Sequence, residues 1–323
     1  RKFSLRRDEA LTLYRKMALV RLAEEKIRQE YFNDEMKTPV HLGIGAEAIT
    51  VGVNHQLPSS TKYFGTYRNH ALYLTLTNDT DSFYGEMYGK VTGASKGKAG
   101  SMHMMAPDRG LIATSAVVGT TTPLAVGAAL ANKYLGLEDW VVAFFGDGTV
   151  EEGAFWESLN FACLHHLRVL FGCEDNDLAI HTPKKDRRGY ASLLKIVGSY
   201  DCHTAEGDGT DLLSVTETAA SMVSIMRKDP KPGFLNFPYF RFYEHVGPKE
   251  DFSAGYRAQP TPEELSQLDP VLKFEAVLLA HGISSGELAS IRASVEKQIE
   301  SSVRAAHSAP FPAPEELLTD VLI

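Results

Sequence analysis

Two unbroken apolar segments in the middle of the chain predict neighbouring parallel strands. They cover residues 141–148 and 168–176, and the glycines 146 and 148 end the first. Residues 151–167, between them, predict a helix, with Trp156, Leu159 and Cys163 on one face. Strands buried on both faces and joined by a crossover helix form a parallel βαβ unit. The pattern therefore predicts such a unit at the centre of the fold.

Helical spacing of apolar residues extends on both sides of this unit. It predicts helices at 8–31, with Asp8 as N-cap, at 123–136, at 211–227 and around 288–299. A further strand is expected at 233–243, whereas 38–115, rich in Gly, His and Tyr, predicts long functional loops. The Pro-rich residues 310–314 predict an irregular end that could dock elsewhere. We expect one domain over residues 1–323, with its core at 38–257 and a helical tail at 258–323.

Composition narrows the function classes. The chain is 44% hydrophobic, which excludes global disorder, and its net charge of −8 with no basic stripe argues against nucleic-acid binding. No apolar run approaches the roughly 20 residues of a membrane span. The three cysteines form no C-x-x-C pair, so we expect a reducing compartment, the cytoplasm.

A carboxylate and an amide stand at the ends of the two central strands. Asp147 follows the first strand and Asn176, 29 positions later, ends the second. At the carboxyl edge of a parallel sheet the two would lie side by side, where ligands bind. Carboxylate, amide and carbonyl oxygens suit magnesium, and glycines at a helix N-terminus allow a diphosphate to approach. Either residue alone is more often a helix cap or a turn residue, but the paired spacing favours the metal.

The glycine spacing argues against a nicotinamide enzyme. After Gly146 and Gly148 the next glycine is Gly153, so the segment is not G-x-G-x-x-G, and the expected acid about 20 residues further on is missing.

GDG followed by Asn176 resembles the thiamine diphosphate signature. Across residues 8–257 the chain resembles the alpha subunit of the decarboxylating component of 2-oxo acid dehydrogenases, the pyruvate dehydrogenase type. The segments KGKAGSMHM, TTTPLAVGAALANKYLG, FFGDGTVEEGAFWESLNFA and CEDNDLAIHT occur in the family's order. The resemblance implies an α/β, three-layer thiamine-diphosphate-binding fold with a mostly parallel sheet and helical additions at both ends.

The resemblance also implies roles for single residues. Asp147, Asn176 and the carbonyl of Leu178 match the Mg²⁺ ligands. Further cofactor contacts are implied at Tyr67, Arg68, Ala106, Ala116, Val118, Gly148, Thr149 and His245. Arg68 is chemically suited to a diphosphate, because its guanidinium binds phosphate with two hydrogen bonds.

Three of the 11 histidines fall in matched motifs with implied catalytic roles, namely His41, His70 and His245. Imidazoles near neutrality can orient a substrate and transfer protons. His103 matches a family histidine of less defined role, whereas His165 and His166 are interpreted as surface residues. Glu151 and Glu152 are interpreted as surface partners of a helix dipole.

The family glutamate that activates the cofactor ring belongs to a beta subunit. Nothing in this chain replaces it, and Glu47 matches a different family glutamate. The resemblance therefore implies a heterotetramer of two alpha and two beta chains, and an inactive chain when alone. The small apolar stretch 115–135 is either ordinary core packing or partly an interface with other subunits.

Departures from the family pattern leave the reaction partner open. Ala46 replaces a Gln, Gly43 and Gly45 suggest a roomier or differently shaped pocket, and Val246 replaces the serine that is phosphorylated in mitochondrial members. The Glu-His-x-Gly-Pro segment around His245 resembles a branch associated with sugar and polysaccharide pathways.

We expect decarboxylation of a 2-oxo acid and acyl transfer to lipoamide. The alternatives are transketolase- or acyloin-type transfer to an aldehyde or keto sugar, and a non-catalytic binding paralogue.

Overall fold

One six-stranded parallel sheet forms the centre of the molecule. The computed structural model describes residues 5–320. The strand order is β2-β1-β3-β4-β8-β7, and every pairing in it is parallel. The strands are β1 (Lys62–Thr66), β2 (Leu111–Ser115), β3 (Val141–Gly146), β4 (Val169–Asp175), β7 (His203–Glu206) and β8 (Gly233–Pro238). A small antiparallel hairpin, β5 (Leu178–Ala179) with β6 (Thr182–Pro183), follows β4 directly.

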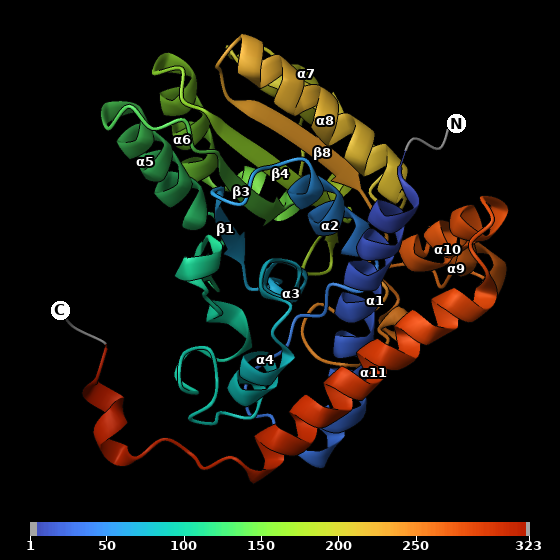
Figure 1. Cartoon of the computed structure of the whole chain (residues 1–323). Coiled ribbons are helices and arrows are strands. Elements are labelled where there is room, and N and C mark those ends of the chain that lie inside the picture. The colour runs from blue at the N-terminus through green and yellow to red at the C-terminus, as the bar shows by residue number, and fades with distance from the viewer. Residues whose placement is uncertain (1–4, 321–323) are drawn as a thin grey trace.

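Helices cover both faces of the sheet (Figure 1). They are α1 (Arg7–Glu30), α2 (Glu47–His55), α3 (His70–Thr77), α4 (Thr80–Met87), α5 (Thr121–Tyr134), α6 (Gly153–Leu164), α7 (Leu193–Val197), α8 (Leu212–Lys228), α9 (Pro262–Leu268), α10 (Pro270–Ala280) and α11 (Ser285–Ser308). Alternate residues of β3 enter different cores: Val142 and Phe144 pack with α1, α2 and α8, whereas Ala143 and Phe145 pack with α5 and α6. The expected three-layer α/β fold is therefore confirmed.

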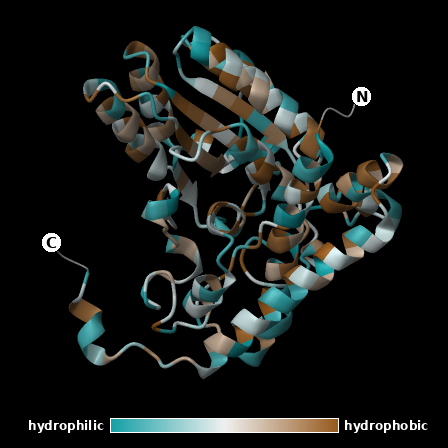
Figure 2. Cartoon of the chain, in the orientation of Figure 1, coloured by the Kyte–Doolittle hydropathy of each residue, from teal (hydrophilic) through white to brown (hydrophobic). Residues whose placement is uncertain are grey.

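The apolar strands lie between more polar helix surfaces, as Figure 2 shows. The predicted βαβ unit is confirmed as β3, α6 and β4. The helix at the N-terminus is also confirmed, but Asp8 lies in its first turn and not at the N-cap. Arg6 precedes the helix instead, and its backbone N–H donates to the Glu9 carboxylate at 3.2 Å. The strand expected at 233–243 ends at Pro238, and the N–H of the next residue, Tyr239, donates to the Asp175 carbonyl at the end of β4.

The prediction of long loops at 38–115 was wrong in part. This stretch holds α2, α3, α4, β1 and β2. Residues Glu47–Val53 of α2 and His70–Thr75 of α3 are all buried. Short helices that are buried along most of their length are hard to recognise, because a short apolar segment can equally be a buried strand.

Residues 91–101 do form an irregular loop, and one buried carboxylate supports it. Glu86, at the end of α4, is 1% exposed. Its two oxygens accept hydrogen bonds from the backbone N–H groups of Ser95, Gly97, Ala99 and Gly100, at 2.8–3.0 Å. Because a buried carboxylate needs several donors, this arrangement satisfies Glu86 and fixes the loop at once.

Helix α11 lies along α1, and after α11 the chain ends in an extended arm (Figure 1). The Pro-rich stretch is irregular as predicted, apart from a 3₁₀ turn at Pro314–Leu318. Lys96 contacts Glu316 and Asp320 at 3.2 and 2.9 Å, and Lys98 donates to the Thr319 carbonyl at 2.7 Å. The arm thus lies against the 91–101 loop of its own chain, and its docking to a partner stays a prediction. Residues 321–323 lie outside the described part.

Among residues 5–320 we find no helix with the length and apolar character needed to cross a bilayer.

Candidate cofactor-binding site

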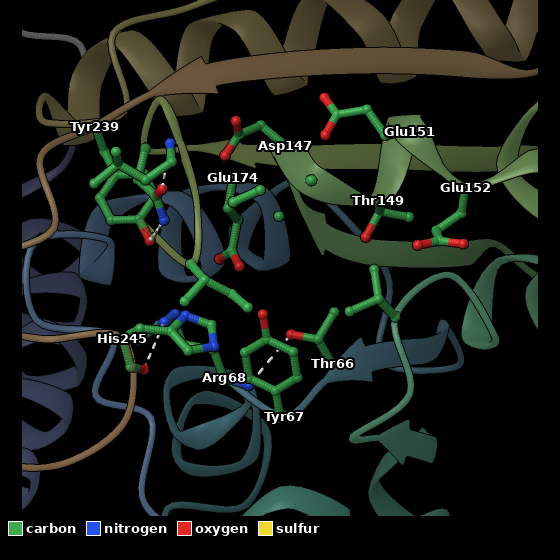
Figure 3. Close-up of a pocket in the computed structure, with 17 residues that line it drawn as sticks. Thr66, Tyr67, Arg68, Asp147, Thr149, Glu151, Glu152, Glu174, Tyr239 and His245 are labelled. Carbon is green, nitrogen blue, oxygen red and sulfur yellow. Dashed lines mark hydrogen bonds between the residues drawn. The ribbon is translucent and has the colours of Figure 1, made fainter. Parts of the chain in front are cut away.

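A cavity of about 260 Å³ opens at the carboxyl edge of the sheet, beyond the ends of β1, β3, β4 and β8. In Figure 3 the acidic residues of the β3 and β4 ends form one wall, and Tyr67, Arg68 and His245 lie opposite. The lining comprises Thr66, Tyr67, Arg68, Val118, Gly146, Asp147, Gly148, Thr149, Glu151, Glu152, Glu174, Asn176, Leu178, Ala179, Ile180, Tyr239 and His245. Most of the cofactor contacts expected from the sequence are therefore gathered here.

The strand register brings the predicted metal ligands together. Gly146 of β3 pairs with Glu174 of β4, so Asp147 and Asn176 both lie just beyond these paired strand ends. Asp147 is fully buried, and its Oδ1 has no hydrogen-bond partner. The side chain of Asn176 donates to Tyr239 at 3.1 Å and accepts from the Leu178 N–H at 3.0 Å. A buried carboxylate oxygen without a donor is costly unless a cation binds it, so the site fits a hard metal ion.

The described residues contain no cluster of three His, Cys, Asp or Glu side chains suited to a metal. The candidate set has one such side chain, Asp147, together with an amide and a carbonyl. That composition fits magnesium, which is typically held by one or two carboxylates plus the phosphates of a bound nucleotide or cofactor.

Two arginines that the sequence reasoning missed contact Asp147. Arg187 donates to Asp147 Oδ2 and to Glu151, and Arg188 donates to the Asp147 carbonyl at 2.8 Å. Burial and the carboxylate of Asp175 raise the pKa of Asp147 to about 6, although both arginines oppose this shift. In the sequence these arginines are only two adjacent cations in a charged loop, and such a run of charges usually faces solvent. The sequence alone therefore did not indicate a role in the site.

Two further residues of the cavity were not singled out from the sequence. Glu174 is 7% exposed, and burial raises its pKa to about 7. Tyr239 lies just beyond β8 and accepts the Asn176 hydrogen bond described above. Glu174 is the second-last residue of β4 and Tyr239 follows β8, so their place at this edge could have been inferred from the strand pattern.

Arg68 joins two loops at the floor of the cavity. Its guanidinium donates to the carbonyl of Leu42 and to the carbonyl of His245, the latter at 3.2 Å. The loops are also paired directly, since the Gly247 N–H donates to the Val40 carbonyl at 2.8 Å. Arg68 therefore fixes the loops of both predicted catalytic histidines while it lines the cavity.

His41, Tyr67 and His245 form one aromatic cluster. The ring centroids of His41 and Tyr67 are 4.4 Å apart, those of His41 and His245 5.2 Å, and those of Tyr67 and His245 5.6 Å. Burial, reinforced by the positive charge of Arg68, lowers the pKa of His41 to about 3 and that of His245 to about 4. Both imidazoles are therefore neutral at physiological pH, and Nδ1 of His41 is buried without a partner.

His70 lies behind this cluster and not on the cavity wall. Its ring is fully buried, with Nδ1 2.8 Å from Glu24 and Nε2 2.6 Å from the Ser101 hydroxyl. Both oxygens of Glu24 also accept from the Gly43 N–H, at 2.8 and 2.9 Å. His70 and Glu24 thus support the loop that carries His41, and the catalytic role predicted for His70 stays a prediction.

The same loop is held a second time at Gly45. Glu47 accepts from the Gly45 N–H at 2.9 Å and pairs with the buried Arg21. Gly45 has φ +107°, and a Cβ there would lie 2.1 Å from the Phe240 carbonyl. Neither Gly43 nor Gly45 lines the cavity, so they do not widen it directly, and a differently shaped pocket stays a prediction. Gly45 instead permits a close contact between two backbone segments.

The other predicted residues divide between the cavity and its surroundings. Gly148 and Thr149 lie in a 3₁₀ turn after β3, and with Val118 they line the cavity. Ala106, Ala116 and His103 are not among the lining residues. Glu151 and Glu152 are exposed as expected, but the surface interpretation was incomplete, because both line the cavity and Glu151 pairs with Arg187. His165 and His166 lie outside the site.

Comparison with known proteins places the chain in a family. The model of the family described as "Dehydrogenase E1 component" matches residues 15–315. The alpha subunit of acetoin:2,6-dichlorophenolindophenol oxidoreductase from Cupriavidus necator is 33% identical, over 99% of this chain and 96% of its own. The pyruvate dehydrogenase E1 component subunit alpha of Zymomonas mobilis is 30% identical, over 98% of this chain and 89% of its own.

The chain belongs to the dehydrogenase E1 component family. The family expected from the sequence is thereby confirmed, and with it the enzyme class, a thiamine-diphosphate-dependent 2-oxo acid dehydrogenase alpha subunit.

Proposed function

We propose that this member of the E1 family works with a beta subunit, as a heterotetramer of two alpha and two beta chains, to decarboxylate a 2-oxo acid and transfer the acyl unit to lipoamide. Magnesium would join the cofactor diphosphate to Asp147, Asn176 and the carbonyl of Leu178. The observation that carries the proposal is the buried, unpartnered Oδ1 of Asp147 beside Asn176 at the sheet edge. A non-catalytic paralogue would have no reason to keep such a costly arrangement.

When bound, thiamine diphosphate supplies the carbon that attacks the substrate carbonyl and accepts the electron pair of the broken bond. The chain's own residues bind, orient and exclude water. Arg68 lies where its guanidinium can face a diphosphate, and Gly148 and Thr149 offer backbone N–H groups after β3. Burial lowers the pKa of His41 and His245, so both are neutral weak bases that can each donate a hydrogen bond from the ring N–H and accept one at the other ring nitrogen.

The exposed face of α5 supports the requirement for a second subunit. Ala125 and Ala129 of this helix pack in the core, but Leu124, Tyr134 and Leu135 are 52–82% exposed. Leu164 of the neighbouring α6 is also 70% exposed. Large apolar side chains grouped on adjacent helices are typical of a protein interface. We therefore propose that part of the 115–135 stretch contacts another subunit, while its inner face is ordinary core.

The neutral histidines favour a second candidate function. A carboxylate substrate binds best to a fixed positive charge, and burial lowers the pKa of both imidazoles so that neither supplies one at pH 7. Arg68, the cation of the lining, is the residue proposed for the cofactor diphosphate. An uncharged α-hydroxy ketone needs no such charge. The Cupriavidus necator relative is named for acetoin, a compound of that class. The second candidate is therefore acyloin chemistry, namely cleavage of such a ketone or, in reverse, transfer of the acyl unit to an aldehyde or keto sugar.

A substrate panel on the reconstituted alpha–beta complex decides between the candidates. The panel holds pyruvate, longer 2-oxo acids and acetoin, each with a lipoyl domain, an aldehyde or a redox dye as acceptor. Release of carbon dioxide from a 2-oxo acid with acylation of the lipoyl domain supports the first candidate. Cleavage of acetoin alone, without carbon dioxide, supports the second, and no turnover with any pair contradicts both.

A further inference from the structure

The two oxygens of the Asp147 carboxylate have different surroundings. Oδ1 is buried without a partner, whereas Oδ2 accepts from Arg187, which reaches over from the loop after the β5–β6 hairpin. The same guanidinium donates to Glu151 and, through Nε, to the Thr182 carbonyl at 3.1 Å. The Arg187 side chain is 9% exposed and that of Asp147 1%. Arg187 therefore holds one oxygen of the carboxylate, with Arg188 3.7 Å from the same oxygen, and the other oxygen is left without a partner.

The charges around this contact balance. Arg188 donates to Glu151 at 3.1 Å and to the Asp147 carbonyl at 2.8 Å. Asp147, Glu151, Arg187 and Arg188 thus form a group of two carboxylates and two guanidinium ions. Because their formal charges cancel, the group imposes little net field on a metal–diphosphate pair that is itself close to neutral. The main effect of the group is to fix the orientation of the Asp147 carboxylate.

We propose that Arg187 is a positioning residue for the metal ligand Asp147: by binding Oδ2 and Glu151 together, it fixes the carboxylate so that Oδ1 faces the metal. The inference rests on the proposed role of Asp147 in binding magnesium. A free carboxylate would rotate about its last bond, and binding of the ion would have to stop that rotation. Outer partners that orient a metal ligand typically contribute about 10–100-fold in metal affinity.

The contact also couples the metal to a loop. Lys184, in the turn after the hairpin, pairs with Asp175 at 2.8 Å, so residues 182–188 are attached to both strand ends of the site. Since the ordered loop orients Asp147, metal binding must in turn favour the ordered loop, because coupling between two sites is reciprocal. The loop contains four trypsin sites, at Lys184, Lys185, Arg187 and Arg188.

Magnesium affinity of the alpha–beta complex tests the proposal. Calorimetric titration with Mg²⁺ at saturating thiamine diphosphate compares the wild type with Arg187→Gln, Arg187→Lys and Lys185→Gln. The last is the matched control, because Lys185 is exposed in the same loop and loses the same charge. We expect Arg187→Gln to bind Mg²⁺ about 10–100-fold more weakly. Arg187→Lys should be several-fold weaker, since it keeps the charge without the fork, and Lys185→Gln should match the wild type.

Equal magnesium binding by Arg187→Gln would overturn the proposal. Tighter binding would overturn it as well, and would mean that the positive charge of Arg187 simply repels Mg²⁺. If that variant does not assemble, trypsin digestion of the wild type gives the answer. Magnesium with the cofactor should slow cleavage within residues 184–188 at least about tenfold, and a rate independent of magnesium overturns the coupling. The Asp147→Ala complex separates failure of the Arg187 proposal from failure of the proposed function. If this complex still binds the cofactor in a magnesium-dependent way, Asp147 is not the metal ligand.

Discussion

Replacement of Glu24 by alanine should loosen the loop that carries His41. Glu24 is completely buried in α1, and it is the acceptor for two groups, the Gly43 N–H and the His70 ring nitrogen. Without it, both donors are left unpaired in a site closed to water. Each buried donor left without a partner costs about 1–3 kcal/mol, so the variant should lose about 2–6 kcal/mol of stability.

Thermal unfolding of the alpha–beta complex measures this loss. For a chain of this size 1 kcal/mol corresponds to about 2 °C in melting temperature, so we expect a decrease of at least about 4 °C. The matched control is Glu25→Ala, since Glu25 is the next residue of the same helix but only half-buried; its loss should stay below about 1 kcal/mol. Turnover should fall as well, by up to about 100-fold, because displacement of a catalytic group by about 1 Å has that effect.

A gentler change at Glu24 should have an intermediate effect. Glu24→Gln keeps the volume and one acceptor oxygen for Gly43, and it loses only a charge-assisted bond, about 1.5–3 kcal/mol. It should therefore lie between the wild type and Glu24→Ala in both melting temperature and turnover. A Glu24→Ala complex that melts within 2 °C of the wild type would refute the view that these hydrogen bonds hold the loop.

Four other changes test the remaining parts of the site. Asp147→Ala should abolish magnesium-dependent cofactor binding, measured by calorimetry of the alpha–beta complex; unchanged affinity would contradict the metal assignment. His245→Ala should leave cofactor affinity largely intact and lower turnover by roughly 100-fold or more, the scale for a lost acid–base group, whereas an equal loss of cofactor binding would make it a binding residue. Gly45→Ala should cost at least about 2 kcal/mol in thermal unfolding, because its Cβ would meet the Phe240 carbonyl, while Gly43→Ala, with nothing nearer than 3.7 Å, should cost less than about 1 kcal/mol. The chain purified alone should release no carbon dioxide from 2-oxo acids and should oligomerise or aggregate in light scattering; a monomer that turns over unaided would contradict the need for a beta subunit.

The central strands of the fold could be predicted because their burial leaves a pattern within a few consecutive residues. β3 and β4 are buried on both faces, so each appears in the sequence as an unbroken apolar run that ends in polar residues. The positions of Asp147 and Asn176 then follow from the parallel register alone. The roles of Tyr67, Arg68 and His245 depended on family resemblance, since no spacing along the chain relates them to the sheet edge.

The supporting residues could not be predicted, for a physical reason. Glu24 bonds Gly43, His70 bonds Ser101, and Arg187 bonds Asp147, so each contact joins residues separated by 19–40 positions. Nothing in the periodicity of a helix or loop marks one charged residue as the one that turns inward. Glu24 in particular lies in α1 beside Glu25, and only the fold distinguishes the buried acid from its half-buried neighbour.

The loop held by Glu86 has a consequence for how this sequence can change over evolutionary time. Since its bonds go to backbone N–H groups, the half-buried side chains of Ser95 and Ala99 take no part in them, whereas proline, which has no N–H, is excluded at both positions. Gly97 and Gly100 are more restricted, with φ +75° and +62° and backbone or Thr38 atoms within 2.6 Å of a would-be Cβ. Homologues should therefore change more at position 95, outside the KGKAGSMHM segment shared with the family, than at 97, 100 or the acid at 86, which orders the loop although it belongs to α4.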